Sequence, residues 1–251
     1  MSFYLEFILT LILGMTQHNK PQNYPASPEV ISRFSPWLAP FTYFIVCKII
    51  LPFYFKIKVR GQKKIPTNKE ATILAPTHRS RWDPLIVAYM VGLVTKRYLR
   101  YMVSQEQTEG FQGWFIRRLG GFPVDRDNPG ISALRNSVKI LKDREMLVLF
   151  PEGKIYPEDS EIHCIQPGVS RIALQVMSSS PEINLKVIPI SILYDYPAPP
   201  PWGCGVQVNV GSPLEVKDYL GYSTKQGAQK LTTDIEFSLK ELHKKCYSRF
   251  N

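Results

Sequence analysis

The sequence lacks an uninterrupted apolar run long enough for a simple membrane-spanning helix, which needs roughly 20 residues. The run from Phe3 to Met15 is too short, and the longer run from Trp37 to Phe55 contains Pro40, Pro52 and a central Lys48. A lysine at mid-bilayer costs about 2.5–3.5 kcal/mol on insertion scales. We therefore expect an interfacial, shallowly inserted helical segment at residues 37–55. A buried hydrophobic helix followed by a solvated charged turn is the alternative.

Other familiar features are also missing from the sequence. The four cysteines include no CxxC pair, so a disulfide framework is not indicated and a reducing compartment fits the chain. The four histidines are scattered without a metal-ligand spacing, so no metal is expected. The absence of a GxSxG motif disfavours a serine hydrolase. Aromatic residues do not alternate with basic ones as on single-strand nucleic-acid platforms, so no nucleic-acid partner is expected.

The amino-terminal region shows few features of a secretory signal. Residues 3–15 follow no basic segment and precede no evident small-residue cleavage site. Met15 is an alternative start site, ahead of a polar, proline-containing linker that ends at Pro28. We expect residues 1–56 to form a hydrophobic membrane-associating region that includes this linker, and residues 57–251 to form the main folded domain.

Acidic residues are in the minority. Lysine and arginine total 31 against 21 acidic residues, a formal net charge of +10, which favours anionic partners. Five cations follow the longer apolar run directly: Lys56, Lys58, Arg60, Lys63 and Lys64. Each is worth about 1 kcal/mol beside an anionic leaflet, and the cytoplasmic leaflet is the anionic one. The sequence therefore predicts attachment to an anionic membrane surface on its cytoplasmic face.

From residue 57 onward, short apolar runs alternate with helix-like stretches. This alternation predicts an α/β fold: a single layered domain with a mixed, partly parallel β-sheet flanked by helices. The expected strands are 71–76, 98–103, 122–125, 146–150, 185–193 and 206–210. The expected helices are 84–91, 110–119, 131–142, 169–177 and 226–245.

The stretch ILAPTHRSRWDPLIV, residues 73–87, places charged residues between two apolar segments. His78 and Asp83 are about 500° apart around an ideal helix, so they can meet only where the chain turns. Pro76 ends the strand, and Asp83-Pro84 has the pattern of a helix N-cap followed by proline at the first helical position. An imidazole oriented by a carboxylate can take a proton from a hydroxyl group. This spacing also arises by chance, with Asp83 only capping the helix and His78 exposed.

Two further polar segments follow apolar strands. GGFPVDR, residues 120–126, ends in Arg126, whose planar guanidinium suits a phosphate. LVLFPEGKIY, residues 147–156, contains Glu152, Gly153 and Lys154, and its glycine lets the backbone approach a ligand closely. Taken alone, the first segment is more often a surface ion pair and the second a plain turn. If the strands are parallel, however, all three polar segments converge at one edge of the sheet, where α/β proteins place ligands.

In their order and spacing these segments resemble the sequence blocks of the glycerolipid acyltransferase family, the PlsC-like enzymes that acylate glycerol-3-phosphate or lysophosphatidic acid. HRSRWD matches the HxxxxD block, and GGFPVDR matches a G-x-x-[FP]-[VI]-[DE]-R block. FPEGK matches the FPEG block through Gly153, and VIPISI around Pro189 matches a fourth. The resemblance covers roughly residues 57–213, which identifies the expected folded domain as an acyltransferase catalytic domain.

The resemblance implies that His78 is the general base and Asp83 its partner. It also implies that Arg126, Glu152 and Gly153 serve the acyl acceptor. The donor would be a fatty acyl thioester on coenzyme A or acyl carrier protein, a co-substrate, with no further cofactor. The acceptor hydroxyl would attack the thioester directly, without an acyl-enzyme intermediate.

Three basic residues distinguish this chain within that family. Lys154 stands where a small residue is usual, and it can add a cation for a phosphate or narrow the acceptor pocket. Arg79 and Arg81 make the histidine block more basic than in many relatives. Either arginine can contact an anionic substrate, or it can face lipid headgroups or solvent.

The activity we expect is acylation of lysophosphatidic acid to phosphatidic acid, in phospholipid biosynthesis. Acylation of glycerol-3-phosphate or another lysophospholipid is the nearest alternative. Hydrolysis of an acyl thioester is an alternative from another class, because the same base can activate water.

Overall fold

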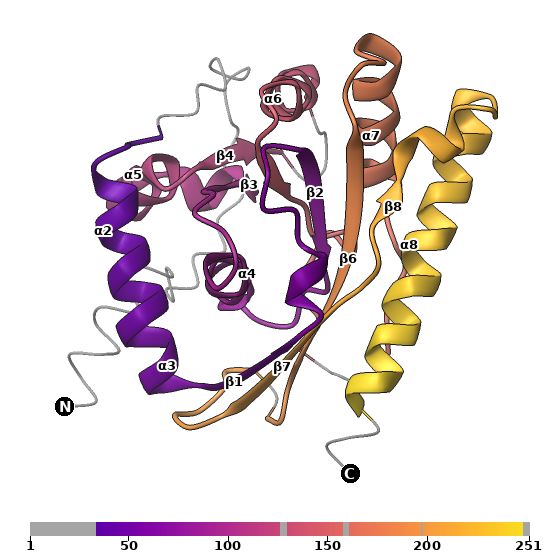
Figure 1. The fold of residues 1–251 in the computed structure, drawn as a ribbon. Coiled ribbons are helices and arrows are strands. Elements are labelled where there is room, and N and C mark those ends of the chain that lie inside the picture. Colours follow the sequence, from indigo (N-terminus) through magenta and orange to yellow (C-terminus); the bar gives the residue numbers. More distant parts are fainter. Residues whose placement is uncertain (1–33, 126–129, 158–160, 197, 248–251) are drawn as a thin grey trace.

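Helices cover both faces of a single mixed sheet (Figure 1). The computed structural model describes residues 34–125, 130–157, 161–196 and 198–247, the side chains of residues 246 and 247 excepted. In these residues the sheet has eight strands, in the order β1-β7-β6-β2-β5-β3-β4, with β8 paired to β6. The strands are β1 (Lys56–Arg60), β2 (Ala71–Pro76), β3 (Leu99–Ser104), β4 (Gly121–Val124), β5 (Met146–Val148), β6 (Leu185–Tyr194), β7 (Gly205–Val210) and β8 (Leu214–Glu215).

The central strands run in the same direction. β2 is parallel to β5 and β6, and β3 is parallel to β4 and β5. β7 is antiparallel to β6, while edge strand β1 is parallel to β7. The predicted mixed, partly parallel sheet flanked by helices is therefore confirmed. Because β2, β4 and β5 are parallel, their carboxyl ends lie at one edge of the sheet, as the three polar segments require.

Alternate residues of the strands point to two separate hydrophobic cores. Ile73 and Leu147 pack in the core beneath α6, α7 and α8, whereas their neighbours Leu74 and Val148 pack in the core beneath α4 and the first helices. The α-helices are α2 (Leu38–Phe44), α3 (Leu51–Tyr54), α4 (Asp83–Gly92), α5 (Gly110–Arg118), α6 (Ile131–Lys142), α7 (Gly168–Ser179) and α8 (Thr224–Tyr247). Shorter 3₁₀ turns are η2 (Gln62–Lys64), η3 (Gln105–Thr108) and η4 (Val216–Tyr219).

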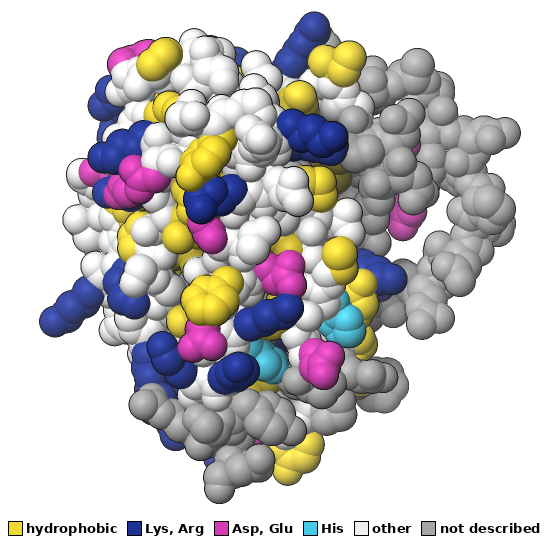
Figure 2. All heavy atoms as spheres, turned by 90° about the vertical axis from the view of Figure 1, so that its right-hand side faces the viewer, with side chains coloured by type: hydrophobic (Ala, Val, Ile, Leu, Met, Phe, Trp, Pro, Cys, Tyr) yellow, Lys and Arg dark blue, Asp and Glu magenta, His cyan; other side chains and the backbone are white. Residues whose placement is uncertain are grey.

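The outer face at α8 is chemically mixed. Figure 2 shows this side, on which basic, acidic and apolar side chains are interspersed and form no continuous basic surface among the atoms in view. Phe237 of α8 is 66% exposed there, amid the lysines and glutamates of the same helix.

The apolar run at residues 37–55 forms one continuous helical segment, in which a π-helical stretch, η1 (Ile45–Ile50), joins α2 to α3. One side of this first helical segment packs into the core through Val46, Cys47 and Leu51. The other side exposes large apolar side chains: Trp37, Phe41, Phe44, Ile49 and Phe53. Across the described part of the chain, no helix combines the length and the apolar character needed to cross a membrane.

The predicted strands and helices all form, with ends within two residues of those expected. β1 was not predicted, because its alternating Lys56, Lys58 and Arg60 were interpreted only as a basic surface cluster. In the structure these three cations are exposed, while Ile57 and Val59 point inward. Charged side chains of this kind protect an edge strand from pairing with other chains. The domain boundary predicted between residues 56 and 57 falls within β1, two residues after the end of the first helical segment, and stays a prediction.

Candidate active site

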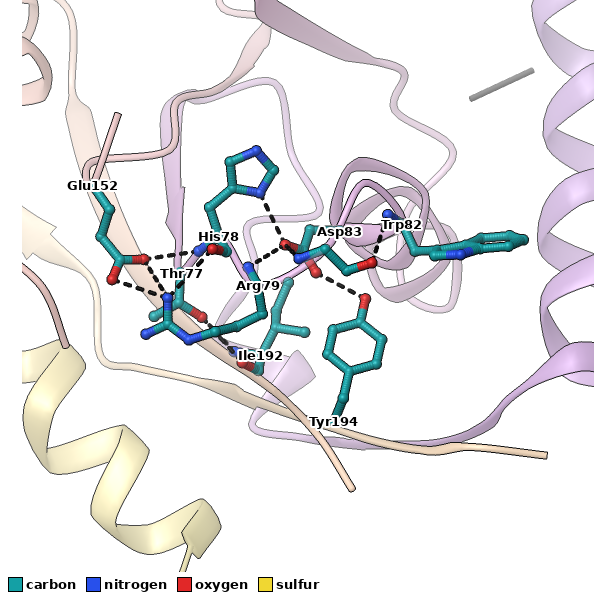
Figure 3. Close-up of polar contacts among 9 residues, drawn as sticks. Thr77, His78, Arg79, Trp82, Asp83, Glu152, Ile192 and Tyr194 are labelled. Carbon is teal, nitrogen blue, oxygen red and sulfur yellow. Dashed lines mark hydrogen bonds and ion pairs between the residues drawn. The ribbon is translucent and has the colours of Figure 1, made fainter. Parts of the chain in front are cut away.

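The loop between β2 and α4 brings His78 to Asp83, as the turn in the sequence predicted (Figure 3). His78 Nδ1 lies 2.9 Å from Asp83 Oδ2, and the Asp83 side chain is fully buried. The His78 ring stacks on Phe150 with 4.0 Å between ring centroids. Since a carboxylate only accepts hydrogen bonds, Nδ1 carries the proton and Nε2 is left as the basic nitrogen.

The Asp83 carboxylate does not cap its own helix. α4 begins at Asp83 itself, so the predicted N-cap role was wrong. Oδ2 instead accepts the backbone N–H groups of Arg79 (2.6 Å) and Ser80 (2.8 Å) together with His78 Nδ1, and Oδ1 accepts the Tyr194 hydroxyl (2.8 Å). The carboxylate therefore fixes the loop that precedes the helix, as well as the imidazole.

Behind the histidine, Glu152 and Arg79 form a buried ion pair. Arg79 Nη1 lies 2.8 Å from Glu152 Oε2 and 3.0 Å from Oε1, and both residues are at most 3% exposed. Glu152 also accepts the backbone N–H groups of His78 (2.8 Å) and His163 (3.1 Å). Both side chains are turned to protein groups, and together they hold the histidine loop. Their predicted contacts with the acceptor are not seen in this geometry and stay predictions.

The FPEG turn contributes backbone to the site. Gly153 has φ = 76°, a left-handed conformation that side chains disfavour, and its N–H donates to the Phe150 carbonyl at 3.1 Å. Lys154 follows, with its Nζ atom 5.1 Å from the centroid of the Tyr156 ring, which stacks on His163. Lys154 does not line the cavity described next, so no acceptor contact of Lys154 is seen in this geometry.

His78 lines a largely apolar cavity of about 720 Å³. Its walls come from the first helical segment, α4, α5, the ends of β3 and β4, and the first turns of α6 and α7. Two cations, Arg81 and Arg171, lie in the same lining as His78. Burial raises the pKa of the Cys47 thiol, another lining residue, to about 11, so this cysteine is protonated and a poor nucleophile. The arrangement suits a long apolar substrate with an anionic end.

The three predicted polar segments do converge. His78, Asp125 and Gly153, one from each segment, line the same cavity. Arg126, the predicted phosphate ligand, lies outside the described residues. Sequence reasoning missed Arg171 and Tyr194, because neither belongs to a recognisable local motif. Among the described residues, no group of three or more histidine, cysteine, aspartate or glutamate side chains is placed to hold a metal ion.

Comparison with known proteins agrees with this geometry. The family model described as Acyltransferase matches residues 56–193, more than half of the chain. The chain belongs to the acyltransferase family. Its relatives identify it as PlsC-like: this acyltransferase is 29% identical over 160 residues to the 1-acyl-sn-glycerol-3-phosphate acyltransferase of Streptococcus pneumoniae, covering 62% of the chain and 54% of the relative. It is 26% identical over 207 residues to the Bacillus subtilis protein of the same name, covering 79% of the chain and 94% of the relative.

A solved structure supports the fold of this acyltransferase. The 1-acyl-sn-glycerophosphate (LPA) acyltransferase PlsC from Thermotoga maritima superposes with a TM-score of 0.66, covering 99% of this chain and 95% of that one. The sequence identity is 17%, so this likeness concerns the fold alone.

Proposed function

We propose that this acyltransferase transfers a fatty acyl group from an acyl thioester to the free hydroxyl of lysophosphatidic acid, giving phosphatidic acid. One observation carries the proposal: His78, paired with Asp83 behind it, lines a large apolar cavity that Arg81 and Arg171 also line. An acyl chain needs the apolar volume, the hydroxyl needs the base, and a phosphate monoester needs the cations. The names of the Streptococcus and Bacillus relatives support the same acceptor.

In the proposed reaction, His78 Nε2 takes the proton from the acceptor hydroxyl while the oxygen attacks the thioester carbonyl carbon. Asp83 stabilises the imidazolium through Nδ1. The tetrahedral intermediate then collapses, the C–S bond breaks, and the proton returns from Nε2 to the departing thiolate. The products are the acylated phospholipid and the free thiol, and no acyl-enzyme forms. A positioned base contributes about 10²–10⁴-fold to such a step.

The acceptor phosphate is assigned to the arginine side chains of the cavity. Arg81 and Arg171 line it, and Arg126 follows directly on lining residue Asp125 in the chain. A guanidinium binds phosphate oxygens in a bidentate manner, so these three arginines are the proposed phosphate ligands.

We further propose that this acyltransferase works at the cytoplasmic face of a membrane. The exposed apolar side of the first helical segment supports interfacial docking, since Phe41 and Phe44 are 64% and 61% exposed. The basic residues of β1 and η2 follow this segment directly and suit anionic headgroups. Residues 1–33, which make up the first part of the expected membrane-associating region 1–56, lie outside the described residues.

The test is an acceptor panel with the full chain in liposomes, using labelled acyl-CoA and acyl carrier protein thioesters in parallel. Label in phosphatidic acid is expected when lysophosphatidic acid is supplied, and His78→Ala should abolish it while leaving thermal unfolding nearly unchanged. Turnover retained by that variant would remove His78 as the base.

The same panel separates the alternatives. Label found only in the acylated product of glycerol-3-phosphate would show that glycerol-3-phosphate, and not lysophosphatidic acid, is the acceptor. That outcome has some support from similarity to mouse mitochondrial glycerol-3-phosphate acyltransferase 1, which is 24% identical over 183 residues, although the alignment spans 22% of that protein. Release of free fatty acid alone would show thioester hydrolysis and contradict acyl transfer.

A further inference from the structure

The last residue of β6 contacts the acid of the active site. The Tyr194 hydroxyl donates to Asp83 Oδ1 at 2.8 Å, while the other carboxylate oxygen, Oδ2, serves His78 (Figure 3). Tyr194 is 111 positions from Asp83 in the sequence and only 5% exposed. Its ring does not line the cavity, so it has no route to the reacting atoms.

The phenol is a permanent donor at this position. Burial, reinforced by the neighbouring Asp83 charge, raises the pKa of Tyr194 well above its ordinary value. The hydroxyl therefore keeps its proton at any pH at which an imidazole titrates, and it can only stabilise the ionised carboxylate.

β6 also holds the other end of the loop. Thr77, which precedes His78, accepts the backbone N–H of Ile192 at 2.9 Å and donates to the carbonyl of the same residue at 3.2 Å. Two alternate residues of one strand, Ile192 and Tyr194, thus fix the residues on either side of the catalytic turn. A rigid strand is a more accurate support than the loop itself.

We propose that Tyr194 is a positioning residue for acyl transfer: its hydroxyl fixes the Asp83 carboxylate so that Oδ2 stays on His78 Nδ1. The role rests on the proposed function. Without the phenol, Oδ1 loses a donor inside the protein, and only the bonds at Oδ2 then orient the carboxylate. A misplacement of about 1 Å in such a relay can cost up to 10²-fold in rate.

The first test compares wild-type protein with Tyr194→Phe, as full chains in liposomes. We expect kcat to fall roughly tenfold to hundredfold, with the KM values for lysophosphatidic acid and acyl-CoA changed less than about twofold. Because the lost donor no longer shares the carboxylate charge, Asp83 should favour the imidazolium more strongly. The acidic limb of the kcat–pH profile should therefore move to higher pH.

The chain contains a matched control. Tyr219 is 6% exposed and its hydroxyl donates to Asp234 at 2.8 Å. This is the same kind of bond away from the cavity, although Asp234 is only partly buried whereas Asp83 is fully buried. Tyr219→Phe should lose no more thermal stability than Tyr194→Phe and should keep wild-type kcat and pH profile. An equal fall in kcat for both variants would show a general effect of stability and overturn the proposal.

Two further measurements keep the proposal testable if Tyr194→Phe folds poorly or if no acceptor is turned over. A fluorotyrosine at position 194 retains the bond with a stronger donor, so the His78 titration should move to lower pH. ¹⁵N-histidine NMR measures that titration without substrate. Only position 194 is altered in this protein, so the Arg79–Glu152 pair that holds the loop is the same as in wild type. Identical His78 titration in wild-type and fluorotyrosine protein would refute the role of Tyr194, whereas failure of all acyl transfer with a shifted titration would refute only the proposed function.

Discussion

Arg79 and Arg81 are two positions apart, yet the fold gives them opposite environments. Arg79 is 1% exposed and paired with Glu152, while Arg81 is exposed and lines the cavity beside His78. The difference arises because the chain turns at Ser80, whose backbone N–H is bound to Asp83. Arg79 therefore contributes to stability, whereas Arg81 is the arginine proposed to bind the substrate phosphate.

Alanine at these two positions should have different effects. Arg79→Ala leaves the Glu152 carboxylate buried without its cation, which should lower the free energy of unfolding by about 3–5 kcal/mol. Arg81→Ala should change it by less than about 0.5 kcal/mol, because the side chain is exposed, and should raise the KM for lysophosphatidic acid. Urea unfolding and steady-state kinetics measure the two effects. A stability loss in Arg81→Ala equal to that of Arg79→Ala would contradict this division.

Among the elements, the first helical segment connects the proposed membrane surface to the active site. At its end, Tyr54 stacks on Trp82 with 5.1 Å between ring centroids, and Phe55 meets the same indole edge-on at 5.0 Å. Trp82 is 2% exposed and directly precedes Asp83. The segment is therefore part of the packing that supports the catalytic turn, and its outer side is free to serve another purpose.

Removing aromatic rings from that outer side should weaken membrane binding. Each fully buried phenylalanine is worth about 1.5–3 kcal/mol, so Phe41→Ser with Phe44→Ser should lower affinity for liposomes at least tenfold. Phe237→Ser, on α8, removes a ring of similar exposure, 66%, from the opposite side of the molecule and should have no effect. Liposome flotation measures both variants, and equal losses would argue against a specific docking side.

The elements were far easier to predict than their contacts. Apolar runs such as residues 71–76 and 185–193 gave the strands, and the predicted meeting of His78 with Asp83 follows from a turn that Pro76 and Pro84 mark locally. The partners of the loop could not be predicted in this way. Glu152 bonds His78 across 74 positions and Tyr194 bonds Asp83 across 111, distances at which no periodicity carries information. The family resemblance assigned Glu152 to the acceptor, and nothing in the sequence indicated its bonds to Arg79 and to the backbone of His78.

For the molecule as a whole, the effect of charge can be tested most directly, because added salt screens it. The net charge of +10 favours anionic bilayers. The cations are not clustered on the face shown in Figure 2, where basic, acidic and apolar side chains are interspersed. The basic residues of β1 and η2 lie directly after the first helical segment in the chain. The proposed membrane binding would therefore combine an apolar and an electrostatic contribution. The two contributions respond differently to salt.

Binding to anionic liposomes should therefore weaken when salt is raised from about 0.1 M to 1 M, as the Debye length falls from about 10 Å to 3 Å. Binding to zwitterionic liposomes should be weaker at the outset and nearly independent of salt, because only the aromatic side chains contribute. Flotation at several salt concentrations checks both expectations. Equal binding to the two kinds of liposome at low salt would mean that the cations do not contribute.

The bond between Tyr194 and Asp83 also has a consequence for synthesis of the chain, because its two residues emerge from the ribosome at different times. Residues 38–54 leave the ribosome roughly 140 residues before Tyr194, which corresponds to roughly 7–28 s at 5–20 residues per second. His78 follows that segment by 24 residues, so for most of the interval the nascent chain has the segment proposed to dock and its histidine, but not the strand that orients Asp83. If the segment docks as proposed, a newly made molecule can reach a bilayer before it has a complete catalytic apparatus.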